Sequence, residues 1–306
     1  MMEQDLNKRS SLTDEAKALM RKMEEIEAIN VEAGLERTLD KIHARRHWNR
    51  TNKLTGWAAI LALPLLLSTL TLGYLLYKSN KEKLRYTEIA VARGSIIRHE
   101  LPDGTLVWLN SGSKLDYPVT FRSDKREVFL SGEGYFEVTA NADYPFYVHT
   151  PEGLSTYVYG TKFNVNAYPE NSYIETVLEE GKVQVQLPSQ DTPITLLPQE
   201  GIFYDKSSQS YVKTGIHSDE YTAWKDGKLI FRNTKIQDVV RRLSRHFNTE
   251  IELNDHSGKD YKYRATFTTE TLPQILDYLS QSTKLIWKEV PLSSGSTRKK
   301  IIIDIY

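Results

Sequence analysis

The hydrophobic and polar positions near the start of the chain follow an amphipathic helical pattern. Within residues 13–47, apolar side chains recur at spacings of four and three residues, first before Asn30 and again after it. This pattern predicts two short helices, the first with Thr13 as its N-cap. Because so short a region cannot bury a core of its own, we expect the two apolar stripes to contact each other or a partner; a solvated stalk is the alternative. The stripes consist of Leu19, Met23, Ile26, Leu35, Leu39 and Ile42.

The second pattern is an uncharged run. Residues 54–77 contain no Asp, Glu, Lys or Arg, and nine of the residues from Gly56 to Tyr77 are leucine. A helix over Gly56 to Tyr77 spans roughly 33 Å, which is enough for the hydrocarbon core of a bilayer. Trp57 and Tyr74 lie where aromatic rings favour the membrane interfaces, and Pro64 is tolerated in a membrane helix. The run therefore predicts one transmembrane helix.

From residue 86 to about residue 215 the pattern changes to β-strands. About eleven short runs rich in aromatic and β-branched residues are separated by turn signals, and Asp-Gly between two such runs is typical of a hairpin. Short strands with tight turns predict a mainly β domain, folded as a sandwich, a barrel or a short solenoid. The turn signals are Asp103-Gly104, Ser111-Gly112, Gly132-Glu133-Gly134, Pro151-Glu152-Gly153 and Glu180-Gly181.

Residues 222–306 predict a small α+β module. Helical periodicity runs to Phe247 after an N-cap at Thr234, and a second helix begins near Thr271. Strand-like runs before, between and after these helices give β-α-β followed by β-α-β-β. The last strand begins with KKIIID at residues 299–304 and could lie at a sheet edge or in the sheet interior.

Charge is balanced on both sides of the uncharged run. The chain has 40 Lys plus Arg and 40 Asp plus Glu in 306 residues, which argues against a protein that binds nucleic acid directly. Within 15 residues of the run on each side, five Lys and Arg precede it and four follow it, which favours residues 1–53 in the cytoplasm and residues 78–306 outside it. The absence of cysteine excludes a disulfide scaffold, thiolate zinc ligands and a cysteine nucleophile.

Candidate chemistry is sparse in this sequence. No metal-ligand, phosphate-loop or nucleophile-elbow spacing occurs, and His43 and His47 fit a surface pair on a helix better than a metal site. The residue types of a catalytic triad occur at Asp103, Ser111 and His149, but these residues fall in predicted turns and strands. We therefore predict a protein without cofactor, metal or catalytic site.

Five segments of the β domain carry a resemblance to a known family: VARGSIIRHELPDGTLVWLNSGSKLDYP, FLSGEGYFEV, PFYVHTPEG, YGTKFNVNAY and EEGKVQVQL. They resemble segments of FecR-type anti-sigma factors, and they occur in that family's order. The C-terminal module, with KLIFRNTKIQDVVRRLSRHFNTEIEL, resembles the short secretin-and-TonB-type domain that many such proteins carry. The resemblance covers about residues 86–290, and the predicted membrane helix lies where the family has it.

The resemblance implies a signal relay across the inner membrane of a Gram-negative cell. Residues 1–53 would bind an extracytoplasmic-function sigma factor in the cytoplasm, with the two apolar stripes covering a surface that the sigma factor uses to engage polymerase. Residues 86–215 and 222–306 would lie in the periplasm. There they would sense the signalling domain of a TonB-dependent outer-membrane transporter.

Gly160-Thr161 has a further implied role. Some members of the resembled family split themselves at a Gly-Thr bond, where the threonine hydroxyl attacks the preceding carbonyl in an N-to-O acyl shift. The same pair also suits an ordinary turn, with glycine for the turn and threonine for the strand. Both interpretations stay open from the sequence.

A different class of function is an envelope protein without a sigma factor. Such a protein would be membrane-anchored and would bind a glycan or another polymer through its β domain. An exposed row of aromatic side chains on one face of that domain would favour this alternative.

Overall fold

The computed structural model describes residues 16–25, 31–79, 85–121, 124–291 and 298–306. It contains two compact units, Met1–Glu82 and Lys83–Tyr306, and we describe each separately.

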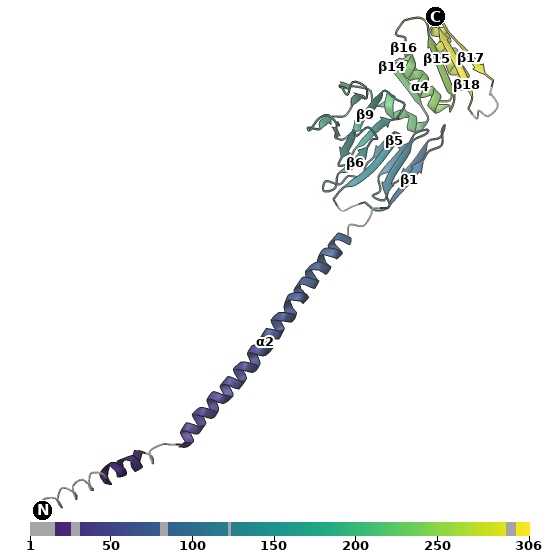
Figure 1. The fold of residues 1–306 in the computed structure, drawn as a ribbon. Helices are drawn as coiled ribbons and strands as arrows, with labels where there is room; N and C mark the ends of the chain where they lie inside the picture. Colours follow the sequence, from purple (N-terminus) through teal and green to yellow (C-terminus); the bar gives the residue numbers. More distant parts are fainter. Residues whose placement is uncertain (1–15, 26–30, 80–84, 122–123, 292–297) are drawn as a thin grey trace, which may run out of the picture. The chain divides into compact units, whose positions relative to one another are not determined.

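The first unit is helical. Residues 16–25 form one helix, and α2 runs without interruption over Val31–Ser79 with Pro64 inside it (Figure 1). The second predicted amphipathic helix and the uncharged run therefore share one helix instead of forming two. Thr13 and Ile26 lie outside the described residues, as do the side chains of residues 43–59.

The hydroxyl groups within the uncharged run bond to the helix that carries them. Ser68 donates to the Leu65 carbonyl at 2.8 Å, and Thr71 donates to the Leu67 carbonyl at 2.8 Å. Such bonds lower the polarity of a helix surface. Among the residues that the structure describes, however, no helix combines the length and the apolar character needed to cross a bilayer. The predicted transmembrane helix is thus not confirmed.

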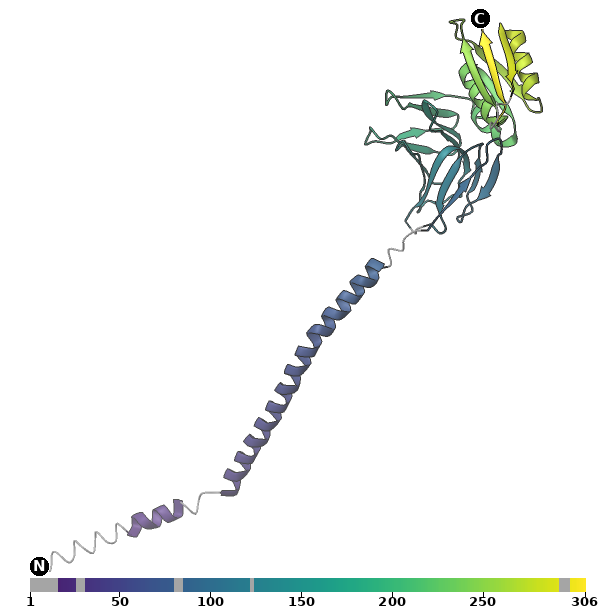
Figure 2. The same cartoon turned by 45° about the vertical axis from the view of Figure 1, so that its right-hand side comes forward.

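The first part of the second unit is a curled, thirteen-stranded β-sheet, and the prediction of a mainly β fold is confirmed (Figures 1 and 2). Its central path runs β11-β10-β7-β6-β5-β8-β9-β12-β13. The strands β1 and β4 form a branch on one half of β5, and β2 and β3 form a branch on the other. The strands are β1 Tyr86–Ala90, β2 Ile97–Glu100, β3 Leu106–Leu109, β4 Lys114–Pro118, β5 Arg126–Glu137, β6 Phe146–His149, β7 Ser155–Val158, β8 Lys162–Ala167, β9 Tyr173–Glu180, β10 Val183–Gln186, β11 Ile194–Leu196, β12 Glu200–Asp205 and β13 Tyr211–Gly215.

The twelve-residue strand β5 joins the two halves of the sheet. Its first residues pair with β4 and in parallel with β6, and its last residues pair with β3 and β8. The prediction of a turn at Gly132-Glu133-Gly134 is therefore wrong. A Cβ on Gly132, whose φ is +115°, would lie 2.5 Å from the Ser113 hydroxyl, so this glycine permits close approach of two backbones.

The other predicted turn signals lie at connections between strands, and Glu180 is the last residue of β9. At Asp103-Gly104, which connects β2 to β3, only Gly104 has a positive φ, and the Asp103 carboxylate accepts from the Thr105 amide at 3.1 Å. The sequence predicted about eleven strands in this domain, and the described residues form thirteen.

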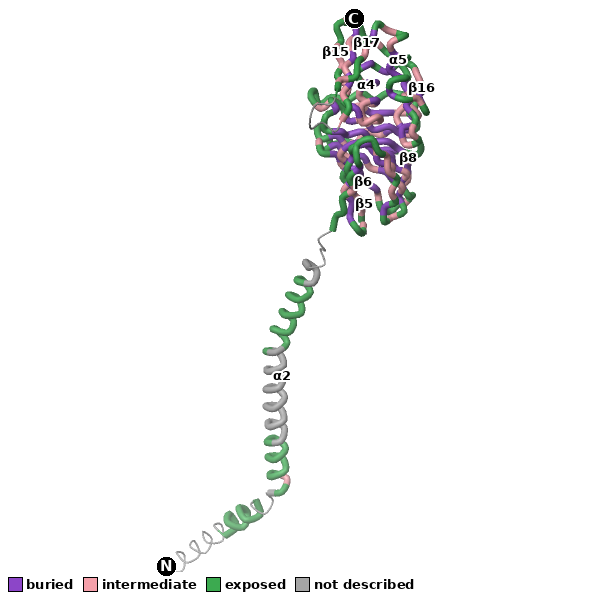
Figure 3. Tube along the Cα trace, turned by 90° about the vertical axis from the view of Figure 1, so that its right-hand side faces the viewer, coloured by how far each residue is buried: buried purple, intermediate pink, exposed green. Residues whose placement is uncertain are grey.

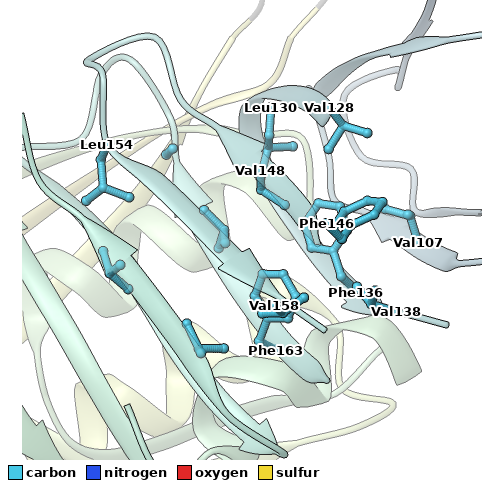
Figure 4. Close-up of a cluster of buried hydrophobic side chains, with 14 of the residues drawn as sticks. Val107, Val128, Leu130, Phe136, Val138, Phe146, Val148, Leu154, Val158 and Phe163 are labelled. Atoms are coloured by element: carbon cyan, nitrogen blue, oxygen red, sulfur yellow. The ribbon is translucent and has the colours of Figure 1, made fainter. Parts of the chain in front are cut away.

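Inward and outward side chains alternate along the strands, and the inward ones form the core of the β domain. In β5, Val128 and Leu130 point into the core while Phe129 points outward. Phe136 stacks on Phe163 with ring centroids 5.2 Å apart, and both are fully buried (Figure 4). Burying each such ring contributes about 1.5–3 kcal/mol.

The remainder of the second unit is a small α+β module with its own hydrophobic core. The β-α-β and β-α-β-β order is as predicted, in a two-stranded and a three-stranded sheet. Within the three-stranded sheet, β18 lies between β15, with which it is parallel, and β17. KKIIID is thus an interior strand. The elements are α3 Asp219–Thr222, η1 Ala223–Asp226, β14 Leu229–Lys235, α4 Ile236–His246, β15 Glu250–Asp255, β16 Lys262–Phe267, α5 Leu272–Ser282, β17 Leu285–Val290 and β18 Lys300–Ile305.

The two helices of this module begin differently. The helix α5 begins directly after Thr271, as the sequence predicted, and Thr271 forms a capping box with Gln274. Thr234 does not cap α4, because it belongs to β14, where its hydroxyl donates to Glu220 at 2.5 Å; Lys235 occupies the N-cap position.

Candidate binding surfaces

The predicted sigma-factor stripes are exposed. Leu19 and Met23 lie on the first helix and Leu35, Leu39 and Ile42 on α2, with exposed fractions from 44% at Leu39 to 64% at Leu19. Their spacing places the members of each stripe on one face of its helix. These side chains are therefore accessible to a partner.

Gly160 and Thr161 lie between β7 and β8. Gly160 has a φ of +148°, and a Cβ there would lie 2.7 Å from the Ala140 Cα, so packing requires glycine. The buried Thr161 hydroxyl donates to the Lys182 carbonyl at 3.2 Å. A cavity of about 320 Å³ adjoins both residues and Gly181.

A row of ring side chains crosses the outward face of the sheet. Ring centroids are 5.9 Å apart from Tyr86 to Phe129, 5.1 Å from Phe129 to His149, 5.9 Å from His149 to Tyr147 and 5.4 Å from Tyr147 to Tyr157. These residues come from β1, β5, β6 and β7 and are exposed or half-buried. We call them the aromatic row.

Polar groups border the aromatic row. His149 bonds to the Ser155 hydroxyl at 2.7 Å and to Glu127 at 3.3 Å, and Lys125 pairs with the same carboxylate at 2.7 Å. Exposed rings beside hydrogen-bonding groups suit a ligand with both apolar faces and hydroxyls. The sequence shows aromatic residues in many of the predicted strands but did not place these rings on one surface. The signal for this surface is the rings at alternate positions of neighbouring strands.

A polar seam joins the β domain to the C-terminal module. The buried Trp224 donates its indole N–H to Asn164 at 3.1 Å, and Asn164 donates to the buried Glu133 carboxylate at 3.0 Å. Asn110 donates to the other oxygen of Glu133 at 2.8 Å. These bonds satisfy a carboxylate that would otherwise be costly to bury.

On the same seam, helix α4 contacts the β domain through Arg245. Its guanidinium lies 3.8 Å from the ring centroid of Tyr168 and donates to Asn171. Tyr168 donates its hydroxyl to the Ser111 carbonyl at 2.7 Å, and burial raises the pKa of this hydroxyl.

Glu175 is an unusual titratable group in this seam. Burial raises the pKa of its carboxyl to about 7, against the opposing effect of Arg242. Asn166 donates to it at 3.5 Å. Its charge therefore changes near neutral pH.

The triad combination does not assemble. Asp103 pairs with the buried Arg126 at 2.8 Å, Ser111 accepts from the Gly94 amide at 2.7 Å, and His149 belongs to the aromatic row. Within the described ranges, no three His, Cys, Asp or Glu side chains gather in a way that could hold a metal ion.

Comparisons with known proteins give a consistent result. The family described as FecR protein matches residues 87–184, and the family described as FecR, C-terminal matches residues 228–295. Two crystal structures of a protein from Parabacteroides distasonis ATCC 8503, provisionally described as an anti-sigma factor, are similar to this chain. One has 32% identity and a TM-score of 0.64 over 71% of this chain and 98% of that chain. The other has 31% identity and a TM-score of 0.65 over 72% and 100%. No curated protein matches the chain.

Proposed function

Because the chain belongs to the FecR family of anti-sigma factors, we propose that this regulator relays a signal from a TonB-dependent outer-membrane transducer to an extracytoplasmic-function sigma factor. The proposed segments are residues 1–53 for the sigma factor, 54–77 for the membrane, and 86–215 with 222–306 for the periplasmic signal. The exposed apolar stripes in the first unit are the observation that carries the proposal.

Inhibition in this scheme is competition for a sigma-factor surface. The double variant Leu35→Asp plus Leu39→Asp should lose binding to the sigma factor encoded nearby, because it places two charges in the second stripe. Glu36→Gln plus Asp40→Asn on the same helix is the control and should retain binding. A pull-down in which the Leu double variant binds as well as the native chain would reject this role.

A membrane anchor in α2 is part of the proposal. The leucines of the uncharged run whose side chains the structure describes are exposed, three of them at the consecutive positions 65–67, and so lie all round the helix, a distribution that suits an apolar environment. Since the chain has no cysteine, the single variants Lys17→Cys and Ser208→Cys report on which side of the membrane each of these two positions lies. A membrane-impermeant maleimide should label Ser208→Cys and not Lys17→Cys in spheroplasts, and equal labelling would reject this topology.

The transducer is proposed to contact the C-terminal module at β17. This strand is an edge of the three-stranded sheet, and Ile286 on it is exposed, so a partner strand could extend the sheet there. Ile286→Asp should weaken binding of the transducer signalling domain, whereas Tyr278→Asp on the exposed face of α5 should not. Equal effects of the two variants would argue against this edge.

The aromatic row favours a second candidate function, which is binding of an envelope glycan without a sigma factor. Sugar rings stack on aromatic faces, and the bordering Glu127 and Ser155 could bond their hydroxyls. Tyr147→Ala plus Tyr157→Ala should abolish co-sedimentation with peptidoglycan if this function holds. Unchanged transcription after deletion of the gene would favour it over sigma-factor regulation.

Self-cleavage at Gly160-Thr161 is the only covalent chemistry that we propose. The hydroxyl of Thr161 would attack the Gly160 carbonyl carbon, the peptide C–N bond would break, and the freed amine would take a proton before water hydrolyses the ester. Thr161→Ser should still give two fragments on a blot and Thr161→Ala only the full chain. Identical bands for the native chain and Thr161→Ala would exclude cleavage.

A further inference from the structure

A cavity of about 520 Å³ lies on the seam between the β domain and the C-terminal module, and its lining is strongly cationic. Of the described residues that line it, five are Lys or Arg and one, Glu170, is acidic. The positive charges come from both parts of the second unit, although the whole chain has no net charge. The five are Arg93 and Lys114 of the β domain, Arg241 and Arg245 of α4, and Arg298 shortly before β18.

The carboxylates around this cavity compensate the positive charges only in part. Arg245 pairs with the exposed Glu170 at 3.5 Å, Lys114 pairs with Glu88 at 3.6 Å on the outer surface, and Arg241 pairs with Asp238 one turn away on α4. Arg93 makes no ion pair with any residue that the structure describes. Burial, and to a lesser degree the positive charge of Arg93, lower the pKa of Arg298. A positive potential therefore persists inside the cavity.

Two of the guanidinium groups, those of Arg245 and Arg298, are held in place before any ligand arrives. Arg245 is stacked on the ring of Tyr168. Arg298 donates to the carbonyls of Ser244 and Thr249 at 3.5 and 3.4 Å, at the end of α4. The loop that carries Arg93 also lies against this helix end: a Cβ on Gly94 would be 2.9 Å from the Asn248 Cβ. Such preorganisation reduces the entropy lost on binding.

We propose that this cavity binds a small multivalent oxyanion, with two or more carboxylate or phosphate groups, that bridges the β domain and the C-terminal module. The planar fork of arginine matches the geometry of both groups, and the cavity lies within the size range of small-molecule sites. One anionic group would bind between Arg93 and Arg298, and another would reach Arg241. The charges of the ligand would then hold the two parts together, in addition to the contacts that Trp224 and Arg245 already make across the seam.

The test is calorimetry on the full chain in nonionic detergent at low salt, with inorganic pyrophosphate and, separately, succinate as probes. Saturable binding is expected for at least one probe, and it should weaken as salt is raised because the contacts are ionic. Tighter binding of pyrophosphate would identify phosphate as the recognised group, and tighter binding of succinate would identify carboxylate; both outcomes support the site.

Three variants locate the binding. Arg93→Gln and Arg241→Gln, one from each side of the seam, should each weaken binding roughly tenfold, as expected for loss of one charged hydrogen-bonding group. Arg264→Gln removes an equal charge from exposed β16, away from the cavity, and should change affinity less than about twofold. Melting curves confirm that the variants fold. Absence of saturable heat with both probes, or equal weakening by all three variants, would overturn the proposal.

Discussion

Leucine side chains have opposite surroundings in the two units of the chain. Leu63 on α2 is 74% exposed, whereas Leu109 on β3 is fully buried. Figure 3 shows this contrast along the trace, with the described part of α2 mostly exposed and the strands largely buried. The strands pair with one another and pack their inward residues into a common core, so those residues are covered by the fold itself. The apolar surface of the helical unit, by contrast, is available for lipid or for another protein.

The largest effect should come from the core of the β domain. Phe136→Ala removes a fully buried ring that packs on Phe163 and Phe146, and we expect a loss of about 3–5 kcal/mol in the free energy of unfolding. This loss can be measured by urea unfolding that is monitored through tryptophan fluorescence. A loss below about 1 kcal/mol would mean that the two units do not differ in the way proposed.

A backbone position should give the next largest effect. Gly132→Ala forces a side chain into a positive φ and against Ser113, so we expect a loss of about 2–3 kcal/mol. Gly227 is the matched control, because its φ is +74° but nothing lies within 4 Å of an added Cβ. Gly227→Ala should cost only about 1 kcal/mol in the same urea experiment. Equal losses would show that close approach at β5 is unimportant.

A substitution at Glu175 tests the contribution of the seam, rather than of the core, to the free energy of unfolding. Because burial raises its pKa to about 7, the folded chain holds an extra proton between the ordinary carboxyl range and pH 7. The free energy of unfolding should therefore fall as pH rises through that window. At pH 8, Glu175→Gln should be more stable than the native chain by about 1–2 kcal/mol, a discounted value because the side chain keeps some exposure. The two chains should converge below pH 4.5; a constant difference at all pH values would contradict this.

The smallest effect is expected on the helical unit. Leu63→Ala and Leu39→Ala each remove an exposed side chain and should change the free energy of unfolding by less than about 0.5 kcal/mol. Leu39→Ala should nevertheless weaken sigma-factor capture. A large loss of stability for either variant would show that α2 packs against the rest of the chain.

Much of the fold could be predicted because local chemistry determines it. Asp103-Gly104 gives a hairpin from its turn preference, and the apolar spacing after Thr271 gives α5 with its capping box. Gly132 was misassigned because a glycine signal is the same for a turn and for a close approach between strands. Thr234 was misassigned because β14 continues to Lys235 through its pairing with β16, which no local pattern reports.

The candidate surfaces also divide into those that the sequence predicts and those that it does not. The stripe of Leu35 and Leu39 is visible in the sequence because helical spacing is local. The aromatic row depends on the register that sets Phe129 opposite His149 in a parallel pair, and the cationic cavity depends on Arg93 meeting Arg298. Such long-range pairing is decided by tertiary packing, so only the structure could reveal these two surfaces.

The position of β5 also has a consequence for the order of folding. Both halves of the sheet pair with this one strand, and its partners β3 and β8 are not its neighbours in chain order. The hairpin of β2 and β3 can form early, but neither half can close until Arg126–Glu137 is in place. In a chain delivered progressively from its N-terminus, the first four strands would wait for β5. Slow and concerted closure around one strand is therefore the kinetic signature that we expect of this domain.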